Sequence, residues 1–336
     1  MQPAEPSACA KALMLARIAH DLYWLGRHLV RAEHTARMLD GLFHADLQGR
    51  PDDPASVTLS WESLLVIMGA GETERPARRD DVVSRRTTDV ANPVSILSCV
   101  TGAREGARTL RDTISAEMWE SVNTFQLLLS KRDLHAGLRA GPYSIYSLVK
   151  ERSALFWGLT GRTMQKDDAR AFLQAGGRLE AADMVLRMLR VALPPGPEAD
   201  GDVAPETPRR DGNALALLRA VGGFQAFMRS AAAPPNAAPV ARFMLYDREF
   251  PDSVAASVES LDGALERVEA EAQDSPPVLR VRRMLADLDF RARVAPGPEA
   301  VTPALRPIQQ ELGRLDIEIH ERYFHPSTVV AQTVTG

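Results

Sequence analysis

The most regular feature of the sequence is a row of apolar residues that begins at Leu15 and ends at Phe43. Its members follow in steps of three and four residues, the spacing of one face of a long helix: Leu15, Ile18, Leu22, Leu25, Leu29, Ala32, Ala36, Leu39 and Phe43. In the polar row beside it, Glu33 and Arg37 have the acid-first order that favours an ion pair along a helix. We predict a helix over residues 13–43.

The same pattern returns between Phe172 and Leu193. Its apolar residues match the first row from Leu22 onward, position by position: Phe172, Ala175, Leu179, Ala182, Leu186, Leu189 and Leu193. Other residues also have counterparts, because Gly26, Glu33, Arg37 and Met38 correspond to Gly176, Asp183, Arg187 and Met188. A weaker copy contains Val100, Ala103, Ala107, Leu110 and Ile114. We expect two or three related helices that pack with these rows facing one another, although two unrelated bundle helices can also share a heptad.

The rest of the chain predicts an all-α protein, a multi-helix bundle without a sheet. No stretch alternates apolar and polar residues for long enough to indicate a strand. Further helices are expected at residues 57–68, 92–129 with a break near Ser115, 143–158, 167–194, 213–229, 251–273, 277–291 and 304–323. Asn92 and Pro93 are suited to begin a helix. Loops are expected at residues 69–89, 231–240 and 295–303.

The Pro-, Gly- and acid-rich segment 194–212 offers almost nothing to bury and is interpreted as a surface loop. It divides an N-terminal helical bundle at residues 13–193 from C-terminal helices at 213–326, which we expect to pack on the same domain. Flexible tails are expected at 1–12 and 327–336.

Composition excludes several classes of protein. The formal net charge of −4 provides no basic footprint for nucleic acid. Two cysteines do not make a disulfide framework. The longest apolar run, residues 64–70, is far too short to cross a bilayer, and no signal peptide is recognisable, so we expect a cytoplasmic protein that does not bind a membrane. Among the 40 basic residues only Lys11, Lys131, Lys150 and Lys166 are lysines, which indicates either genomic bias or a use for planar guanidinium groups.

Familiar catalytic and metal-binding signatures are missing. The sequence has no P-loop, dinucleotide-binding, G-x-S-x-G or H-E-x-x-H motif, so we expect no cofactor bound by this chain itself. No metal site is predicted either. Asp316, Glu318 and His320 lie close together in sequence, but this spacing is more typical of a solvated helix face.

The candidate chemistry is therefore a set of Arg and carboxylate side chains on the three related helices. They are Arg27, Arg31, Glu33 and Arg37, then Arg104, Glu105, Arg108 and Arg111, then Glu180, Asp183 and Arg187. If the three apolar rows meet, these flanks would converge on one polar cleft, where Arg binds carboxylate and Glu or Asp binds ammonium. Structural ion pairs between helices are the alternative. Glu117 follows Ile114 on the weaker row, and either pairs with Arg108 or Arg111 or faces water where the helix bends.

Several stretches also carry a resemblance to a known family. They include MLARIA at 14–19, LYWLGR at 22–27, AREGAR at 103–108, FLQAGGRLE at 172–180, DREFPDS at 247–253 and HERYF at 320–324. Together these motifs resemble the bacterial alpha-E domain family over nearly the whole chain. Singly they are weak, and their combination is specific.

The resemblance implies an all-helical protein whose genes stand beside those of circularly permuted ATP-grasp proteins, often with transglutaminase-like proteins and peptidases. Such neighbours imply ATP-dependent formation of an amide or peptide bond. ATP and Mg would be bound by the ATP-grasp partner, which would make an acyl phosphate. The resemblance also implies Glu at the positions of His20 and Val30, and Arg at those of Gly177 and Ala181, so this chain departs from the family there.

Two hypotheses follow from these observations. In the first, the chain is a subunit of a two-part amide ligase that binds an amino acid or peptide. Catalytic carboxylates would then come from Glu33, Glu105, Glu117 and Asp183, and substrate would be bound by Arg17, Arg27, Arg31, Arg37, Arg104, Arg108, Arg111, Glu180 and Arg187. In the second, the chain is a non-catalytic helical scaffold or partner-binding subunit of the same system. Filled helix interfaces would favour the second hypothesis, and a concave Arg/Glu cleft the first.

Overall fold

The computed structural model describes residues 8–47, 60–68, 78–131, 133–192, 206–230, 233–269, 274–294 and 301–325. Every regular element within these ranges is a helix, which confirms the expected all-α bundle. The helices are α1 (Ala8–Leu47), α2 (Trp61–Ile67), α3 (Arg79–Thr87), α4 (Ile96–Thr109), α5 (Ala116–Lys131), α6 (Leu134–Ala140), α7 (Tyr143–Thr163), α8 (Asp168–Ala192), α9 (Glu206–Ala220), α10 (Phe224–Ser230), α11 (Ala237–Tyr246), α12 (Val254–Val268), α13 (Pro276–Val294), α14 (Val301–Ile319) and the π-helical turn η4 (His320–Phe324).

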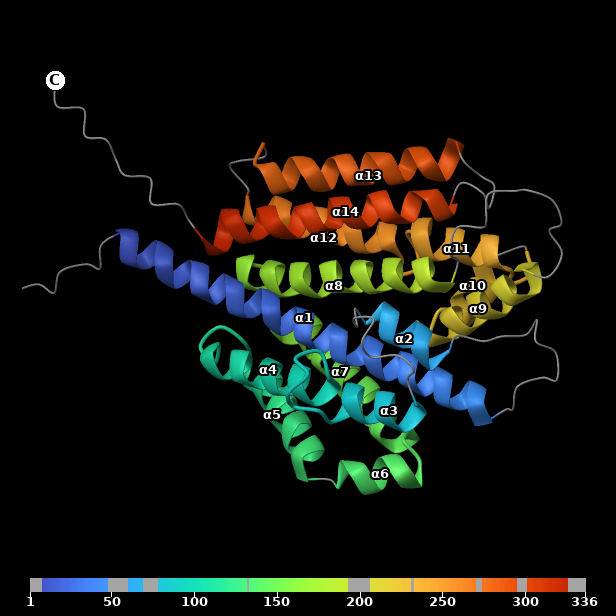
Figure 1. Cartoon of the computed structure of the whole chain (residues 1–336). Coiled ribbons are helices and arrows are strands. Elements are labelled where there is room, and N and C mark those ends of the chain that lie inside the picture. Colours follow the sequence, from blue (N-terminus) through green and yellow to red (C-terminus); the bar gives the residue numbers. More distant parts are fainter. Residues whose placement is uncertain are drawn as a thin grey trace, which may run out of the picture.

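Helix α1 runs through the middle of the molecule (Figure 1). It packs against α8 on one side and against α4 and α7 on the other. The central part of its apolar row, from Leu22 to Leu39, is at most 1% exposed: Leu22, Leu25, Leu29, Ala32, Ala36 and Leu39. The periodic row in the sequence therefore marks the most buried face of the longest helix.

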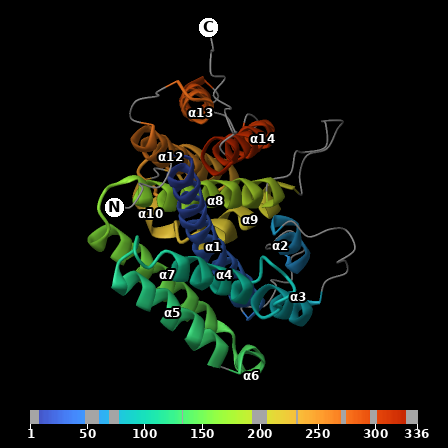
Figure 2. The same cartoon turned by 90° about the vertical axis from the view of Figure 1, so that its left-hand side faces the viewer.

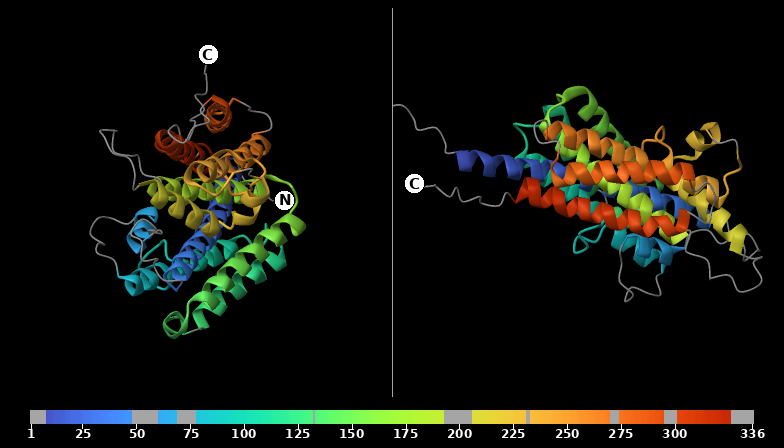
Figure 3. Two further views of the ribbon diagram at one scale, coloured as in Figure 1. Left: turned by 90° about the vertical axis from the view of Figure 1, so that its right-hand side faces the viewer. Right: turned by 90° about the horizontal axis from the view of Figure 1, so that it is seen from above.

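The other helices form layers on the two sides of α1 (Figure 2). On one side α8 packs against α12 and α14, and α13 lies outermost on α12 and α14. On the other side α4 packs against α5, and α5 packs against α7, the green helix beside it in the left view of Figure 3. Four helices that follow residues 193–205 therefore pack directly on α8: α9, α11, α12 and α14.

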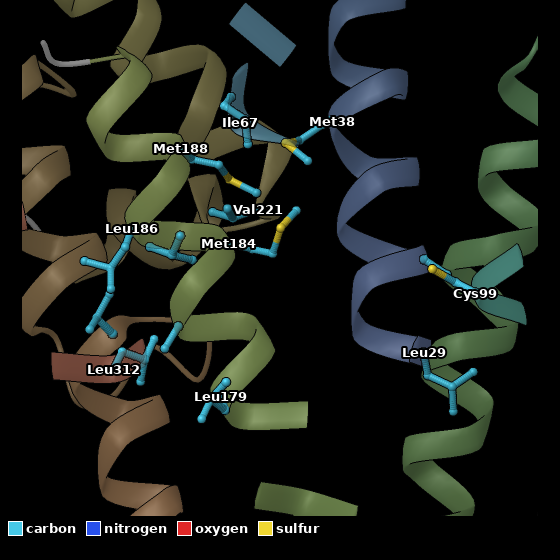
Figure 4. Close-up of a cluster of buried hydrophobic side chains, with 14 of the residues drawn as sticks. Leu29, Met38, Ile67, Cys99, Leu179, Met184, Leu186, Met188, Val221 and Leu312 are labelled. Carbon is cyan, nitrogen blue, oxygen red and sulfur yellow. The ribbon is translucent and has the colours of Figure 1, made fainter. Parts of the chain in front are cut away.

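The two longest repeat helices meet in a shared core (Figure 4). Met38 on α1 and its sequence counterpart Met188 on α8 point into the same space, together with Ile67 and Met184. All four side chains are at most 3% exposed. The buried apolar residues of the described helices form one connected cluster, which includes residues of α1, α4, α8 and α12. This continuity binds the two sides of α8 into one core.

Four loops expected from the sequence contain helix, among them the loop at 295–303, whose residues 301–303 begin α14. Residues 79–87 form α3, because Asp80 and Asp81 begin it, Arg85 and Arg86 end it, and these charges complement the helix dipole. Residues 206–211 belong to α9 and residues 237–240 to α11. The short lengths and mixed polarity of these segments hid their helical period. Residues 69–77, the first part of the loop expected at 69–89, lie outside the described residues.

Helix boundaries also differ in places from those expected. The helix α4 begins at Ile96, not at Asn92, because Ser95 caps it by accepting a hydrogen bond from the Ser98 backbone N–H. The break expected near Ser115 is present between α4 and α5. Helix α1 starts at residue 8, so residues 8–12 are helical and only residues 1–7 of the expected first tail lie outside the described ranges. The second expected tail, 327–336, lies outside them as well.

Within the described residues, the helices are too short or too polar for any of them to span a bilayer.

Candidate functional site

Helices α1 and α8 cross at two glycines that correspond in the repeat. A Cβ atom on Gly26 would lie 2.2 Å from the backbone oxygen of Leu173, and one on Gly176 would lie 1.9 Å from that of Tyr23. Each contacted residue precedes the glycine of its own helix by three positions, so the two contacts are reciprocal. The crossing therefore has local twofold pseudosymmetry, as a true internal repeat predicts, and only glycine permits so close an approach.

Next to this crossing, two guanidinium groups of α1 bind one carboxylate of α8. Arg27 donates from Nε to Glu180 Oε2 at 3.0 Å. Arg31 donates from Nε to Oε1 at 2.6 Å and from Nη2 to Oε2 at 2.8 Å. Glu180 is 1% exposed and Arg27 is 8% exposed. These three residues belong to the larger set that was predicted to converge on one cleft, and the structure brings them together between α1 and α8.

A fourth member of the network, Asp316 on α14, was not predicted. Arg27 Nη1 lies 2.8 Å from Asp316 Oδ2, and the hydroxyl group of Tyr23 donates to Asp316 Oδ1 at 2.7 Å. From the sequence, Asp316 was expected only on a solvated helix face, together with Glu318 and His320. The network thus joins α1, α8 and α14, and it balances two guanidinium groups with two carboxylates.

The electrostatics of this network follow from its burial. Burial alone would raise the pKa of the Glu180 carboxyl, but the hydrogen bonds and charges of Arg31 and Arg27 outweigh it and hold that pKa at about 2. Burial would lower the pKa of Arg27, and the charge of Glu180 is the largest influence that raises it instead. Burial raises the pKa of Tyr23 well above its ordinary value. Glu180 is therefore ionised and Tyr23 neutral near pH 7.

Two further titratable groups lie against the network. His28 fits against Gly102 of α4, where a Cβ atom would lie 2.9 Å from its Nε2. Burial, with the charge of Arg31, lowers the pKa of His28 to about 4. Burial raises the pKa of the Cys99 thiol to about 12. Both groups are neutral near pH 7, so they add no charge to the ion pairs.

The repeat also preserves a second pair of contacts. Glu33 Oε1 and Arg37 Nη2 lie 2.7 Å apart on α1, and their counterparts Asp183 Oδ2 and Arg187 Nε lie 2.7 Å apart on α8. Both are ion pairs within one helix. On α8, Asp183 also accepts from Gln309 of α14 at 2.8 Å. These four predicted residues therefore form two separate pairs outside the central network.

The positions that correspond to the central network in the repeat carry no charged side chains. The positions that correspond to Arg27 and Arg31 are Gly177 and Ala181, and the one that corresponds to Glu180 is Val30. A Cβ atom on Gly177 would lie 2.8 Å from Trp157 Cη2 and 3.4 Å from Val30 Cγ2, so the indole of α7 fills this space. At these positions an apolar contact between Trp157, Val30 and Gly177 therefore lies where the other side of the crossing has ion pairs.

A second polar cluster lies on the outer side of α4. Arg104 donates from Nε to Asn123 of α5 at 2.9 Å and from Nη1 to Glu105 at 2.6 Å. Arg108 donates from Nε to the other oxygen of Glu105 at 2.9 Å. The side chains of Arg108 and Glu105 are 55% and 48% exposed. This group, unlike the central network, is open to solvent.

An aromatic ring extends the same cluster. The guanidinium carbon of Arg111 lies 4.2 Å from the centre of the Trp119 ring, and that of Arg104 lies 5.8 Å from it. Glu117 is exposed in the first turn of α5, so the alternative in which the chain bends and this carboxylate faces water is the one present. We call Arg104, Glu105, Arg108, Arg111 and Trp119 the α4–α5 cluster.

The predicted site residues therefore fall into separate groups. The central network contains Arg27, Arg31 and Glu180, two pairs contain Glu33 with Arg37 and Asp183 with Arg187, and the α4–α5 cluster contains the predicted residues of α4. Arg17 is exposed on α1. Among the described residues, no three His, Cys, Asp or Glu side chains are placed to hold a metal ion.

A surface pocket lies in a different part of the molecule, between α10, α11 and the end of α13. Phe227, Phe243 and Tyr246 line it with Arg242, which donates to the backbone oxygen of Ala292 at 2.9 Å. The sequence did not indicate this pocket, because its lining comes from helices that have no common period.

Comparison with known proteins gives a family-level match. Residues 14–324 match the profile of the Alpha-E family, which is described as a predicted alpha-helical domain with a conserved ER motif. Similar curated proteins include an uncharacterized protein of Mycobacterium bovis and two of Mycobacterium tuberculosis. Each is 24% identical over 339 residues, which cover 95% of this chain and 37% of the relative. The chain thus spans little more than a third of the length of these relatives, and no solved structure matches it.

Proposed function

The chain belongs to the Alpha-E family, and we propose that it is the substrate-binding subunit of a two-part ligase that forms an amide or peptide bond at the expense of ATP. A circularly permuted ATP-grasp protein would bind ATP and Mg and convert a carboxylate to an acyl phosphate. This chain would bind the amino acid or peptide that reacts with it. A transglutaminase-like protein is a further partner that the family resemblance implies.

The length of the relatives supports a function that depends on another protein body. The matching region makes up 37% of each mycobacterial relative, so there it is one part of a longer polypeptide. A region that is joined to other sequence in some proteins is suited to work beside a separate partner in others. The chain also lacks the phosphate-binding motifs that ATP use would require of it.

The observation that carries the proposal is the open Arg surface of the α4–α5 cluster. The guanidinium carbon of Arg111 lies over the Trp119 ring, 4.2 Å from its centre, and the side chain of Arg111 is exposed. Arg108 is more than half exposed and is positioned by Glu105. Guanidinium edges of this kind bind carboxylate or phosphate oxygens through paired hydrogen bonds. The cluster is therefore suited to bind the carboxylate of the nucleophile or the phosphate of the acyl phosphate.

The test is substitution of Arg108 by alanine. Loss of a charge-assisted hydrogen bond costs about 1.5–3 kcal/mol, so kcat/KM for ligation should fall by roughly 10- to 100-fold. The melting temperature should hardly change, because exposed ion pairs contribute about 0–1 kcal/mol. The measurement is amino-acid-dependent phosphate release and amide formation by this protein mixed with an ATP-grasp partner, with each protein alone for comparison.

The matched control is Arg314→Ala on α14. Arg314 lies 2.5 Å from Glu311, three residues earlier, and its side chain is 63% exposed, so the geometry resembles that of Arg108 with Glu105. This variant should retain full activity. The proposal would be contradicted if the ATP-grasp protein released phosphate by itself and the rate did not change when this chain was added.

A second candidate function is a non-catalytic scaffold or partner-binding subunit, and the central network favours it. Arg27 and Glu180 are buried and Arg31 is partly buried, and with Asp316 their charges balance, which is how structural ion pairs are arranged. The pocket beside Phe243 and Tyr246 would then serve partner binding. In this case Arg108→Ala would leave ligation unchanged.

A further inference from the structure

Helix α14 continues without a break into a turn that is wound differently. It forms the π-helical turn η4, in which the backbone N–H of His325 donates to the carbonyl oxygen of His320 at 3.1 Å. Turns of this kind are rare and occur frequently at functional sites. The turn packs against α1, where the red end of α14 approaches that helix in Figure 1. It buries Phe324, and the ring centre of His320 lies 5.6 Å from that of Tyr23 on α1.

The ring of His320 is oriented by the residue one helical turn before it. Its Nδ1 lies 2.8 Å from the backbone oxygen of Asp316 and 3.3 Å from the Oδ1 of the same residue. A carbonyl oxygen can only accept a hydrogen bond, so Nδ1 carries the proton in the neutral ring. The lone pair of the neutral ring is therefore on Nε2, the position of a proton acceptor.

The residue that orients His320 is itself held by the central network. Asp316 accepts from the Tyr23 hydroxyl group at 2.7 Å and from Arg27 at 2.8 Å, and Arg27 is bound in turn by Glu180. The ring of His320 is fixed by its hydrogen bond to the main-chain oxygen of Asp316, and the carboxylate of Asp316, 3.3 Å from Nδ1, is fixed in turn by Tyr23 and Arg27. Catalytic histidines are commonly oriented in this way, by a main-chain carbonyl oxygen or a carboxylate at the ring nitrogen that does not react. The central network thus acquires a role as the support of His320.

Aromatic rings surround His320 on the side of α1. Its ring centre lies 5.0 Å from that of Phe324, 5.6 Å from that of Tyr23 and 6.2 Å from that of Trp24. The ring of His20 lies 6.5 Å away, and the side chains of His20 and His320 are 45% and 26% exposed. The titratable and charged groups nearest to this position are Asp316, His20, Asp21, Tyr23 and Arg27.

The carboxylates first considered as bases are poorly suited to that role. Glu33 and Asp183 are each bound to an Arg side chain, and the hydrogen bond from Arg108 lowers the pKa of Glu105. A carboxylate stabilised by a guanidinium group accepts a proton less readily. Glu117 is exposed on the first turn of α5, where no ring or ion pair described above orients it.

Resting on the ligase function proposed above, we infer that His320 accepts the proton that the amine nucleophile must lose before it attacks. The nucleophile arrives as an ammonium ion and transfers one proton to Nε2. Its freed lone pair forms the C–N bond at the acyl carbon, the C–O bond to phosphate breaks, and phosphate leaves with that electron pair. The second proton of the nitrogen goes to the departing phosphate, and the imidazolium returns its proton to water.

The surroundings select a primary amine or the α-amino group of an amino acid or peptide. The guanidinium group of Arg27 already lies over the Trp24 ring, 4.8 Å from its centre, so the Phe324 ring and the negative charge of Asp316, 3.3 Å from Nδ1, are the neighbours that favour a cation. A carboxylate group would find no guanidinium edge directed toward Nε2 in the contacts of Arg27, which point to Glu180 and Asp316. The carboxylate of the same substrate would have to bind elsewhere.

The first experiment uses the full chain alone, labelled with 15N in histidine. We expect the neutral His320 ring to be protonated on Nδ1, and its signals to move when glycinamide is added but not when acetamide is added. The same spectra of His320→Gln assign the signals. The opposite tautomer, or His320 signals that do not respond to glycinamide, would overturn the inference whatever the ligation assay gives.

The second experiment compares His320→Gln with His325→Gln in the mixture with the ATP-grasp partner. His325 is exposed at the end of the same turn, so its replacement controls for a change in η4. We expect His320→Gln to lower kcat by about 100-fold or more and to remove the acid limb of its pH profile, with little change in KM. His325→Gln should behave like the unmodified protein.

The outcomes separate the two levels of the proposal. If the mixture with the unmodified protein forms product and the mixture with His320→Gln forms it equally well, the role of His320 is overturned and the ligase function stands. A mixture that makes no product with any amine would refute the ligase function itself, and with it the step assigned to His320.

Discussion

At the level of single residues, the buried ion pairs hold α1, α8 and α14 in place. Glu180 accepts hydrogen bonds from both Arg27 and Arg31, and each of its oxygens has a partner. Such a network contributes little when complete, because desolvation offsets the attraction between the charges. Its removal is costly, since the remaining charges stay buried. The main effect of the network is therefore on the specificity of helix packing, because an arrangement that separated these charges would be strongly disfavoured.

Replacement of Glu180 by glutamine should destabilise the protein severely. It leaves the buried Arg27 and the partly buried Arg31 without this carboxylate, a loss of about 3–5 kcal/mol for a broken buried pair. Urea denaturation followed by circular dichroism measures the effect. Glu105→Gln is the matched control, because Glu105 also binds two Arg side chains but its own is 48% exposed. Equal effects of the two substitutions would contradict the assignment of Glu180 as the buried centre.

The depressed pKa of Glu180 also predicts the response of stability to acid. Its pKa is about 2 in the folded protein against an ordinary value of 4.5, so its contribution is fully present above pH 4.5 and is lost as pH falls from there toward 2. The free energy of unfolding of Glu180→Gln should accordingly fall less steeply over that interval.

At the level of the helices, the crossing of α1 and α8 depends on the absence of two side chains. Gly26 and Gly176 allow the backbones of α1 and α8 to touch at two equivalent points. The central network lies on one side of this crossing, and Trp157 lies on the other side. A helix otherwise disfavours glycine by about 1 kcal/mol relative to alanine. The glycines at the crossing are therefore retained for packing, not for helix formation.

Gly176→Ala should force the two helices apart. The added Cβ atom would lie 1.9 Å from the backbone oxygen of Tyr23, so we expect a loss of about 3 kcal/mol or more in the free energy of unfolding. The control is Gly158→Ala in α7, where a Cβ atom meets nothing within 4 Å and should add about 0.5–1 kcal/mol. Thermal denaturation of both variants provides the measurement, and a stable Gly176→Ala protein would show that the helices do not cross at this contact.

At the level of the whole molecule, α8 joins the two sequence regions that flank residues 193–205. It packs on α1 with one face and on α12 and α14 with others, and most of its residues are buried. The ion pair between Arg27 and Asp316 also connects the two regions. The C-terminal helices therefore complete the burial of α8.

A fragment that ends at Ala192 should consequently fail to fold as a stable monomer. Removal of α12 and α14 exposes apolar residues of α8 to water at about 25 cal/mol per Å². Near-ultraviolet circular dichroism and size-exclusion chromatography of the fragment test this expectation, with the full chain as the control. A monomeric fragment with a cooperative melting transition would show that the N-terminal region is a domain by itself.

The sequence by itself determined the helical class, the long helices α1 and α8 and the correspondence of Gly26 with Gly176, because these depend on the local period of burial along one helix. It predicted that eleven Arg and carboxylate residues of three helices converge on one cleft, and of these only Arg27, Arg31 and Glu180 meet in the central network. The short helices α3 and α11 escaped prediction because a few residues do not establish a period.

Only the tertiary structure decided which side chains meet across helices. Asp316 joins Arg27, and His320 lies beside Tyr23, through contacts between segments far apart in the chain. The same packing separated the α4–α5 cluster from the central network and buried Glu180 while it left Glu105 exposed. A local pattern specifies which face of a helix is buried, but the partner of each charge depends on where the glycine crossing places the neighbouring helices.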